Sequence, residues 1–193
     1  TTAAKARISQ SLLFADDLAA VRGDGVFETL LVRDGRASLL EPHLRRLVQS
    51  AAMMDLPESD LAAWRRAVDI AAAQWAAQTP DEGALRLVCS RGRESGSPPT
   101  TYLTITALAP RVDLARRDGV SAALLDRGLA ASGVETMPWL LAGAKTLSYA
   151  VNMAALRHAA HRGADDVIFV SSDGYILEGP RSTVVIAARG ADG

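Results

Sequence analysis

The positions of apolar residues divide the first part of the chain into strands and helices. The stretch GVFETLLV at 25–32, followed by RDG and RASLL, predicts a β-hairpin that turns at Asp34-Gly35. From 41 to 54 apolar side chains recur every three or four residues, and Pro42 stands where a first helical turn accepts proline. The apolar stripe of this expected helix consists of Leu44, Leu47, Val48, Ala51 and Met54.

A second helix and two further strands complete this region. The helix is expected over 58–78, with Ser59 as its N-cap. Its buried side is marked by Trp64, Val68, Ala71 and Trp75. The stretches 83–90 and 100–108 predict strands on either side of the loop RGRESGSPP. Two hairpins around helices indicate a small α+β domain over 1–110.

The remaining residues predict a second domain. The segment RVDLARRDG at 111–119 is expected to be a connector, and a helix is expected over 146–162, ended by Gly163. Strands are expected at 120–126 and 165–171, with a turn at Asp173-Gly174 leading to a strand at 175–179, and one more at 182–187. This gives a second domain over 120–193, in which one long helix covers apolar strands.

Composition narrows the class of protein. The 193 residues are 49% hydrophobic and 22% charged, and the net charge of −1 offers no basic surface for nucleic acid or an anionic membrane. No apolar run is long enough to span a membrane, and the N-terminal residues have no signal-peptide pattern, so a cytoplasmic protein is expected. The single Cys89 excludes an internal disulfide, and the three histidines show no metal-ligand spacing.

One lysine stands out in the stretch AGAKTLSYAVNM. Of the 21 basic residues only Lys5 and Lys145 are lysines, and Lys145 lies among small and apolar neighbours. An amine can lose its proton and attack a carbonyl, which a guanidinium cannot, so Lys145 is a candidate Schiff-base lysine. The alternative is a lysine whose stem lies on apolar surface while its ammonium reaches water.

Two other residues have the chemistry that pyridoxal phosphate needs beside a lysine. Glu178, at the end of YILEG, could keep the pyridine nitrogen protonated, and Arg46, in HLRRL, could bind the phosphate. Spacing does not show that they meet. Glu178 could equally cap a turn, and Arg46 could be a solvated helix residue.

Three stretches together resemble a known family. The stretches are RGDGVFETLLVRDGRASLLEPHLRRL, AKTLSYAVNMAALRHAAHRGADDVIFVSSDGYILEG and STVV. In their order and spacing they are similar to the class IV aminotransferases, the fold-type-IV pyridoxal phosphate enzymes. Within that family GDGVFET and KTLSY most resemble the aminodeoxychorismate lyases. The resemblance implies a two-domain α+β fold, pyridoxal 5′-phosphate as cofactor and a homodimer.

The resemblance also implies roles for particular residues. Lys145 falls on the Schiff-base lysine, Glu178 on the acid at the pyridine nitrogen and Arg46 on the phosphate-binding arginine. Tyr149 matches a tyrosine that bonds the phenolic oxygen of the cofactor in several branches, or is a core aromatic. Four positions are weaker candidates for contact with substrate: Glu28, Thr29, Arg91 and Arg181.

The sequence departs from the family pattern in three places. RGRESGSPP lacks the Arg-x-His of the D-amino acid aminotransferases, which counts against that branch. After Glu-Gly the family has Ser-Asn, whereas this chain has EGPRSTVV, where Arg181 faces either a substrate carboxylate or solvent. Family members continue with a Gly-x-Thr loop and a hydroxyl pair for the cofactor phosphate, so the C-terminal domain is expected to be incomplete in this chain.

The function that the resemblance implies is a lyase that converts 4-amino-4-deoxychorismate to 4-aminobenzoate and pyruvate, a step toward folate. Transamination of a branched-chain or related amino acid on the same site is the first alternative. A catalytically silent fragment that acts only by association is the second. For the enzyme the expected partners are a small-molecule substrate and a second copy of the chain, and neither nucleic acid nor a membrane is expected as a partner.

Overall fold

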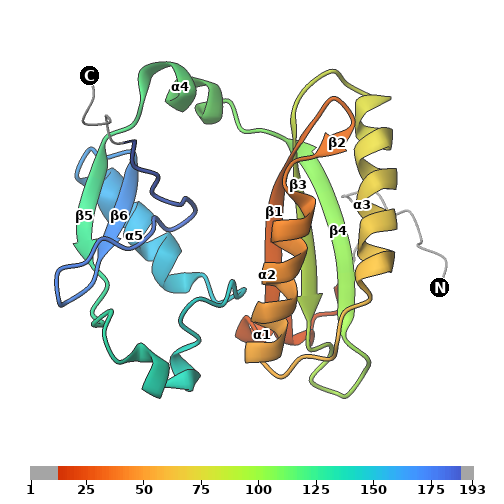
Figure 1. The fold of residues 1–193 in the computed structure, drawn as a ribbon, viewed down its shortest axis with the longest axis horizontal. Coiled ribbons are helices and arrows are strands. Elements are labelled where there is room, and N and C mark those ends of the chain that lie inside the picture. The colour runs from red at the N-terminus through yellow and green to blue at the C-terminus, as the bar shows by residue number, and fades with distance from the viewer. Residues whose placement is uncertain (1–12, 188–193) are drawn as a thin grey trace, which may run out of the picture. The chain divides into compact units, whose positions relative to one another are not determined.

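The computed structural model describes residues 13–187, which form two compact units. The first unit contains the residues up to Val112 together with Leu141–Ser148, and the second contains Asp113–Leu140 and the residues from Tyr149 onward (Figure 1). The segment that carries Lys145 therefore packs with the first unit, although the sequence pattern groups it with the residues that follow.

The first unit is built on an antiparallel sheet of four strands in the order β2-β1-β3-β4. The strands are β1 Gly25–Arg33, β2 Arg36–Ala37, β3 Gly83–Ser90 and β4 Thr100–Ala107. The predicted turn is confirmed, because Asp34 and Gly35 both have positive φ, as a tight hairpin turn of this hand requires. A short helix, α1 Leu18–Arg22, precedes β1.

Two helices, α2 Leu40–Met53 and α3 Leu61–Ala76, cover one face of this sheet (Figure 1). Side chains alternate between faces along a strand, so Val26, Leu30 and Val32 point into this core while Phe27 and Thr29 point to the other face. We call the two sides the covered face and the open face. The cap of α3 is Asp60, whose carboxylate accepts the amide of Ala63, and not the neighbouring serine expected from the sequence.

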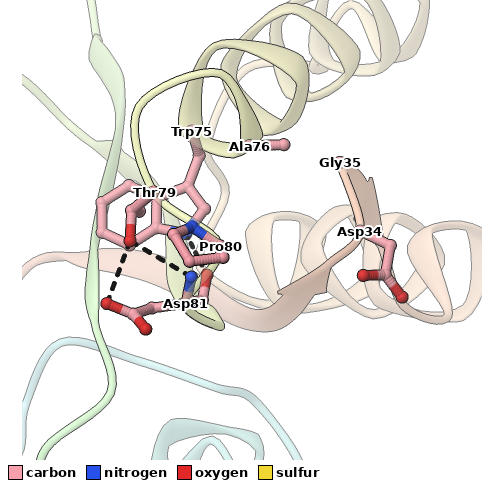
Figure 2. A pocket seen from close by; sticks show the side chains of 7 residues that line it. All are labelled: Asp34, Gly35, Trp75, Ala76, Thr79, Pro80 and Asp81. Carbon is pink, nitrogen blue, oxygen red and sulfur yellow. Dashed lines mark hydrogen bonds between the residues drawn. The ribbon is translucent and has the colours of Figure 1, made fainter.

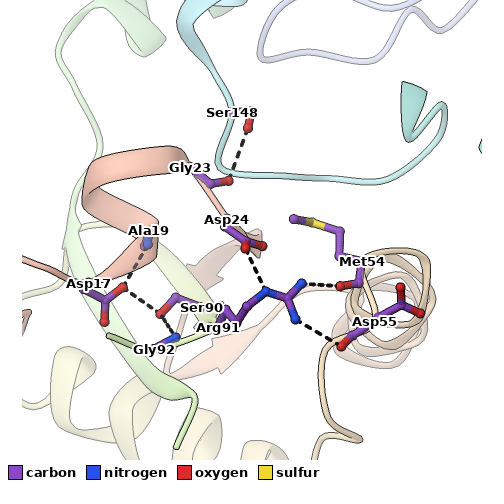
Figure 3. Close-up of polar contacts among 10 residues, drawn as sticks. All are labelled: Asp17, Ala19, Gly23, Asp24, Met54, Asp55, Ser90, Arg91, Gly92 and Ser148. Carbon is purple, nitrogen blue, oxygen red and sulfur yellow. Dashed lines mark hydrogen bonds and ion pairs between the residues drawn. The ribbon is translucent and has the colours of Figure 1, made fainter. Parts of the chain in front are cut away.

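Asp17, the N-cap of α1, is fully buried, and three hydrogen bonds compensate its carboxylate. Two donors, the amide of Ala19 at 2.9 Å and the hydroxyl of Ser90 at 2.8 Å, are drawn in Figure 3. The third is the hydroxyl of Thr100 at 2.7 Å. They tie the chain before β1 to the end of β3 and the start of β4.

The second unit has a smaller core. A parallel pair, β5 Ala122–Asp126 and β6 Asp166–Val170, packs against α5 Ala150–His161 around Ala159, Val167 and Phe169. The segment 111–119, expected to be a connector, is mostly helical as α4 Arg111–Asp118, and two short 3-10 helices follow at Val134–Thr136 and Pro138–Leu140. Among the described residues no helix is long and apolar enough to cross a membrane.

Three predictions for the later part of the chain are wrong in detail. The helix expected from 146 begins only at Ala150, because Thr146 forms an antiparallel bridge with Val26 of β1. The stretch 175–179 contributes a single bridge, Val170 to Ile176, and 182–187 forms no strand. The mixed helix-and-sheet class that was expected is confirmed.

Candidate functional site

The main chain around Lys145 forms an extra strand segment along the first residues of β1. The amide of Phe27 donates to the carbonyl of Lys145 at 3.1 Å, and the amide of Leu147 donates to the carbonyl of Gly25 at 2.8 Å. On its other side the amide of Lys145 donates to the hydroxyl of Ser50, a buried residue of α2, at 3.0 Å. Both backbone groups of Lys145 are thus fixed.

The side chain of Lys145 lies on the open face of the sheet. Its Nζ is 4.6 Å from the centre of the Phe27 ring, and Phe27 is only 8% exposed. The guanidinium of Arg86, on β3, lies 5.5 Å from the same ring centre. Both cations are therefore close to the one aromatic ring, which attracts positive charge. Such a pair offers a reactive amine, from Lys145, next to a guanidinium, from Arg86, that can bind an anion.

Arg86 was missed by the sequence reasoning. In the stretch GALRLVCS it occupies an ordinary outward position of an alternating strand. The useful signal is the register, which pairs Arg86 with Thr29 and Val88 with Phe27. Thr29 is exposed on the same open face, which is compatible with its expected contact with substrate.

Arg46, the expected phosphate ligand, is paired with Glu28 on the covered face. Its Nε donates to Oε1 at 2.5 Å and its Nη2 to Oε2 at 2.6 Å, a side-on arrangement. Glu28 is completely buried and also lies 2.7 Å from Nδ1 of His43. The carboxylate of Glu28 therefore faces α2 and not the open face on which a substrate contact was expected.

Helix α2 brings Arg46 and the Lys145 segment close together. Arg46 and Ser50 are four residues apart, so they lie on the same side of the helix, about 6 Å apart along its axis. Since Ser50 accepts the main-chain amide of Lys145, the backbone of Lys145 lies near the helical turn that carries Arg46, while the Lys145 amine itself lies on the open face. In their chemistry, an amine and a guanidinium suit an aldehyde and a phosphate respectively.

Arg91, a weaker candidate for substrate contact, holds together three segments of the first unit (Figure 3). It donates to the carboxylate of Asp24 at 2.7 Å and to the carbonyls of Met54 at 2.5 Å and Asp55 at 3.3 Å. Hydrogen bonding to Asp24 raises the pKa of Arg91 above its ordinary value. Through these contacts Arg91 holds the turn before β1 in place. In the same turn the carbonyl of Gly23 accepts a hydrogen bond from the hydroxyl of Ser148.

The other expected site residues belong to the second unit. Glu178 is exposed, and its carbonyl accepts the amide of Phe169 in β6. The loop after it is held by Asn152 of α5, whose side chain donates to the carbonyl of Pro180 at 2.9 Å. Tyr149 is the half-buried N-cap of α5, and Arg181 is exposed. Their cofactor and substrate roles remain predictions.

A hollow near the other end of β1 is unrelated to this arrangement. It is lined by Asp34, Gly35, Trp75, Ala76, Thr79, Pro80 and Asp81 (Figure 2). Asp34 follows the last residue of β1, whereas the lysine segment pairs with its first residues, so the two places are roughly 25 Å apart along the strand. Within residues 13–187 no group of three or more His, Cys, Asp or Glu side chains could hold a metal ion.

Comparison with known proteins agrees with this geometry. The model of the family described as amino-transferase class IV matches residues 25–191. The chain belongs to the class IV aminotransferase family. The match begins at the first residue of β1 and includes the segment of Lys145, Arg46 and the loop of Glu178.

Two relatives refine the position of the chain within class IV. It is 71% identical over 182 residues to a bifunctional aminodeoxychorismate lyase / D-amino acid transaminase from Mycobacterium tuberculosis, which covers 94% of this chain and 63% of the relative. A structure of a hypothetical aminotransferase from the same organism, in its PLP-bound form, has a TM-score of 0.88 at 69% identity, covering 91% of this chain and 62% of that one.

A fold IV-transaminase from Curtobacterium pusillum superposes with a TM-score of 0.85 at 47% identity, covering 91% of this chain and 59% of that one. The chain thus spans about six tenths of the length of these relatives. The Mycobacterium tuberculosis relative is described with both activities. The lack of Arg-x-His was expected to count against the D-amino acid branch, yet this 71% identical relative is described as a D-amino acid transaminase as well as a lyase.

Ser50 gives a direct test of how the lysine segment is held. Ser50→Ala removes the acceptor of the Lys145 amide in a buried position, which is expected to cost about 1–3 kcal/mol of unfolding free energy. Hydrogen exchange at the Lys145 amide should become faster, while the amides of β3 keep their protection. Gln49→Ala, at an exposed neighbouring position of α2, is the control and should change neither. Unchanged protection of Lys145 in Ser50→Ala would contradict this docking.

Proposed function

We propose that the protein is a pyridoxal phosphate-dependent lyase acting on 4-amino-4-deoxychorismate, with Lys145 as the amine that holds the cofactor aldehyde. The observation that carries the proposal is the placement of Lys145. Its main chain is fixed on both sides, and its amine lies over Phe27 with Arg86 on the same ring. A structural surface lysine needs none of these constraints.

The residues present fit the cofactor in their chemistry. The amine of Lys145 suits the aldehyde, and the guanidinium of Arg46, within one helical turn of Ser50, suits the phosphate. The exposed carboxylate of Glu178 suits the pyridine nitrogen. When bound, the cofactor supplies an electron-accepting ring that stabilises negative charge on the carbon next to the substrate amine.

Lys145 then has two proton transfers to perform. Once the substrate amine has replaced it, the free amine of Lys145 removes the proton from the carbon that bears the substrate nitrogen. In the substrate, the bond from the ring carbon to the enolpyruvyl oxygen then breaks, and the substrate ring becomes aromatic. Lys145 returns the proton to the departing enolpyruvyl group, which leaves as pyruvate. The same residue thus serves as base and as acid.

Transamination of D-amino acids is a second candidate function. The bifunctional Mycobacterium tuberculosis relative, 71% identical to this chain, supports it. The same lysine begins both reactions by removing the same proton, so substrate contacts on the open face decide between them. Transamination of a branched-chain amino acid remains the further alternative, in line with a 26% identical relative described as a putative branched-chain-amino-acid aminotransferase from Methanocaldococcus jannaschii.

The setting of the enzyme is part of the same proposal. The class IV resemblance favours small-molecule substrates, and the single Cys89 suits a reducing compartment such as the cytoplasm. A homodimer is typical of the family. Both are expectations that size measurement and fractionation can check.

Product analysis tests the proposed function. The protein supplied with pyridoxal phosphate and 4-amino-4-deoxychorismate should release fluorescent 4-aminobenzoate, and Lys145→Ala should lose at least about 10³-fold in turnover, because the amine proposed to carry the proton is removed. D-alanine with an α-keto acid and L-leucine with an α-keto acid are the parallel assays. Amino transfer without any 4-aminobenzoate would refute the lyase assignment and leave a transaminase.

Arg86 is proposed to bind a carboxylate of the substrate beside the amine. Arg86→Gln should raise KM about tenfold or more, because a charge-assisted hydrogen bond is lost, while the affinity for pyridoxal phosphate stays within about twofold. Arg45→Gln, on the exposed side of α2, is the control and should leave KM unchanged. An unchanged KM in Arg86→Gln would place the carboxylate site elsewhere.

A further inference from the structure

We propose that Glu28 is a positioning residue that orients Arg46 for the phosphate of the cofactor, with His43 holding the carboxylate in place; this rests on the proposed function. The position of Glu28 in the sheet is the first reason. Along the covered face of β1 the neighbouring core residues are Val26, Leu30 and Val32, all at most 1% exposed. A carboxylate in this apolar row is costly unless it is compensated.

The exposed fractions of the partners give the second reason. The side chain of Glu28 is 0% exposed, whereas that of Arg46 is 42% exposed. Glu28 therefore depends on Arg46 for compensation, but Arg46 could be solvated without Glu28. An apolar residue at 28 would fill the core without this dependence. We therefore explain the acid at position 28 by its effect on the orientation of Arg46.

The geometry of the pair shows what that is. Glu28 takes the Nε–Nη2 edge of the guanidinium through two hydrogen bonds, at 2.5 and 2.6 Å. The guanidinium is planar and rigid, so fixing this edge turns the Nη1 side away from the carboxylate. Arg46 has five N–H donors, and its rotamer freedom is removed before any ligand arrives. A phosphate then meets an arginine that is already in one orientation.

His43 fixes the carboxylate from a second direction. Its Nδ1 lies 2.7 Å from Oε2 of Glu28. An ionised carboxylate only accepts hydrogen bonds, so Nδ1 carries a proton and donates it. The 3.5 Å approach of Arg46 Nη2 to the same Nδ1 is then a contact between two donors and not a hydrogen bond. Glu28 is held by α2 through two side chains one helical turn apart.

The experiment compares two ligands that differ only in the phosphate. Binding of pyridoxal phosphate and of pyridoxal to the protein is measured by absorbance titration, and the ratio of the two affinities isolates the phosphate contribution. Glu28→Gln keeps the shape and loses the charge, and the ratio should fall about tenfold while pyridoxal binding stays within about twofold. Glu41→Gln is the control. It breaks a side-on pair with Arg65 of the same geometry, in which both side chains are exposed, and should leave the ratio unchanged.

The sign of the effect separates orientation from simple charge. If Glu28 acted only as a nearby negative charge, its neutralisation would tighten phosphate binding, and a tighter or unchanged ratio would overturn the proposal. Arg46→Lys keeps a cation for Glu28 but lacks the planar fork of donors, so the ratio of pyridoxal phosphate affinity to pyridoxal affinity should fall to a similar extent. A ratio as high as that of the wild type in this variant would also overturn the proposal.

Stability measurements separate folding from binding. Arg46→Gln should be markedly less stable to urea than wild type because it leaves the buried carboxylate unpaired, and Glu28→Gln in the same chain should restore the stability but not the phosphate preference. Failure of the double variant to regain stability would contradict the compensation argument. A wild-type protein that binds neither ligand would refute the proposed function together with this inference, whereas normal wild-type binding with an unchanged ratio in Glu28→Gln would refute this inference alone.

Discussion

The arrangement depends on the pairing of the Lys145 segment with the edge of β1. After Val112 the chain passes through residues of the second unit and comes back to the first unit at Leu141. Backbone hydrogen bonds at Gly25 and Phe27 then hold it against the sheet. Because the backbone bonds fix which way each side chain points, the bridge between Val26 and Thr146 puts Lys145 on the open face. These contacts, all within the first unit, hold the backbone of Lys145 in place.

Close approach at this edge restricts the residues that can stand there. A Cβ added to Gly25 would lie 2.7 Å from the carbonyl oxygen of Cys89 and 2.8 Å from Cδ1 of Leu147. Only glycine permits the strand, its neighbour β3 and the lysine segment to meet at this point. The GDG sequence before VFET thus has a packing explanation, which joins its role in the family motif to the docking of the lysine.

The elements of the first unit could be predicted largely from the sequence, because its strands and helices show clear periods of two and of about 3.6. The second unit was harder. The stretch 182–187 is mostly apolar and rich in β-branched residues, yet among the described residues it forms no strand, since strand formation depends on a partner that local sequence does not specify. The helix of 146–162 was placed too early because pairing with β1 overrides the helical pattern of its first residues.

For the site, the chemistry of Lys145 and Arg46 could be read from residue type and family motif, but their surroundings could not. Glu28 and Arg86 occupy alternate faces of neighbouring strands, and only the register shows which of them shares the open face with the lysine. That Glu28 is wholly buried and compensated by Arg46 is a property of packing between β1 and α2. No local pattern contains it.

Identification of the modified lysine tests the central claim most directly. The protein is incubated with pyridoxal phosphate and reduced with borohydride, and the labelled peptide is mapped by mass spectrometry. The chain has only two lysines, Lys5 and Lys145, so each serves as the internal reference for the other. The account predicts stoichiometric label on Lys145 and little on Lys5. Equal labelling of the two lysines, or no label on Lys145, would contradict it.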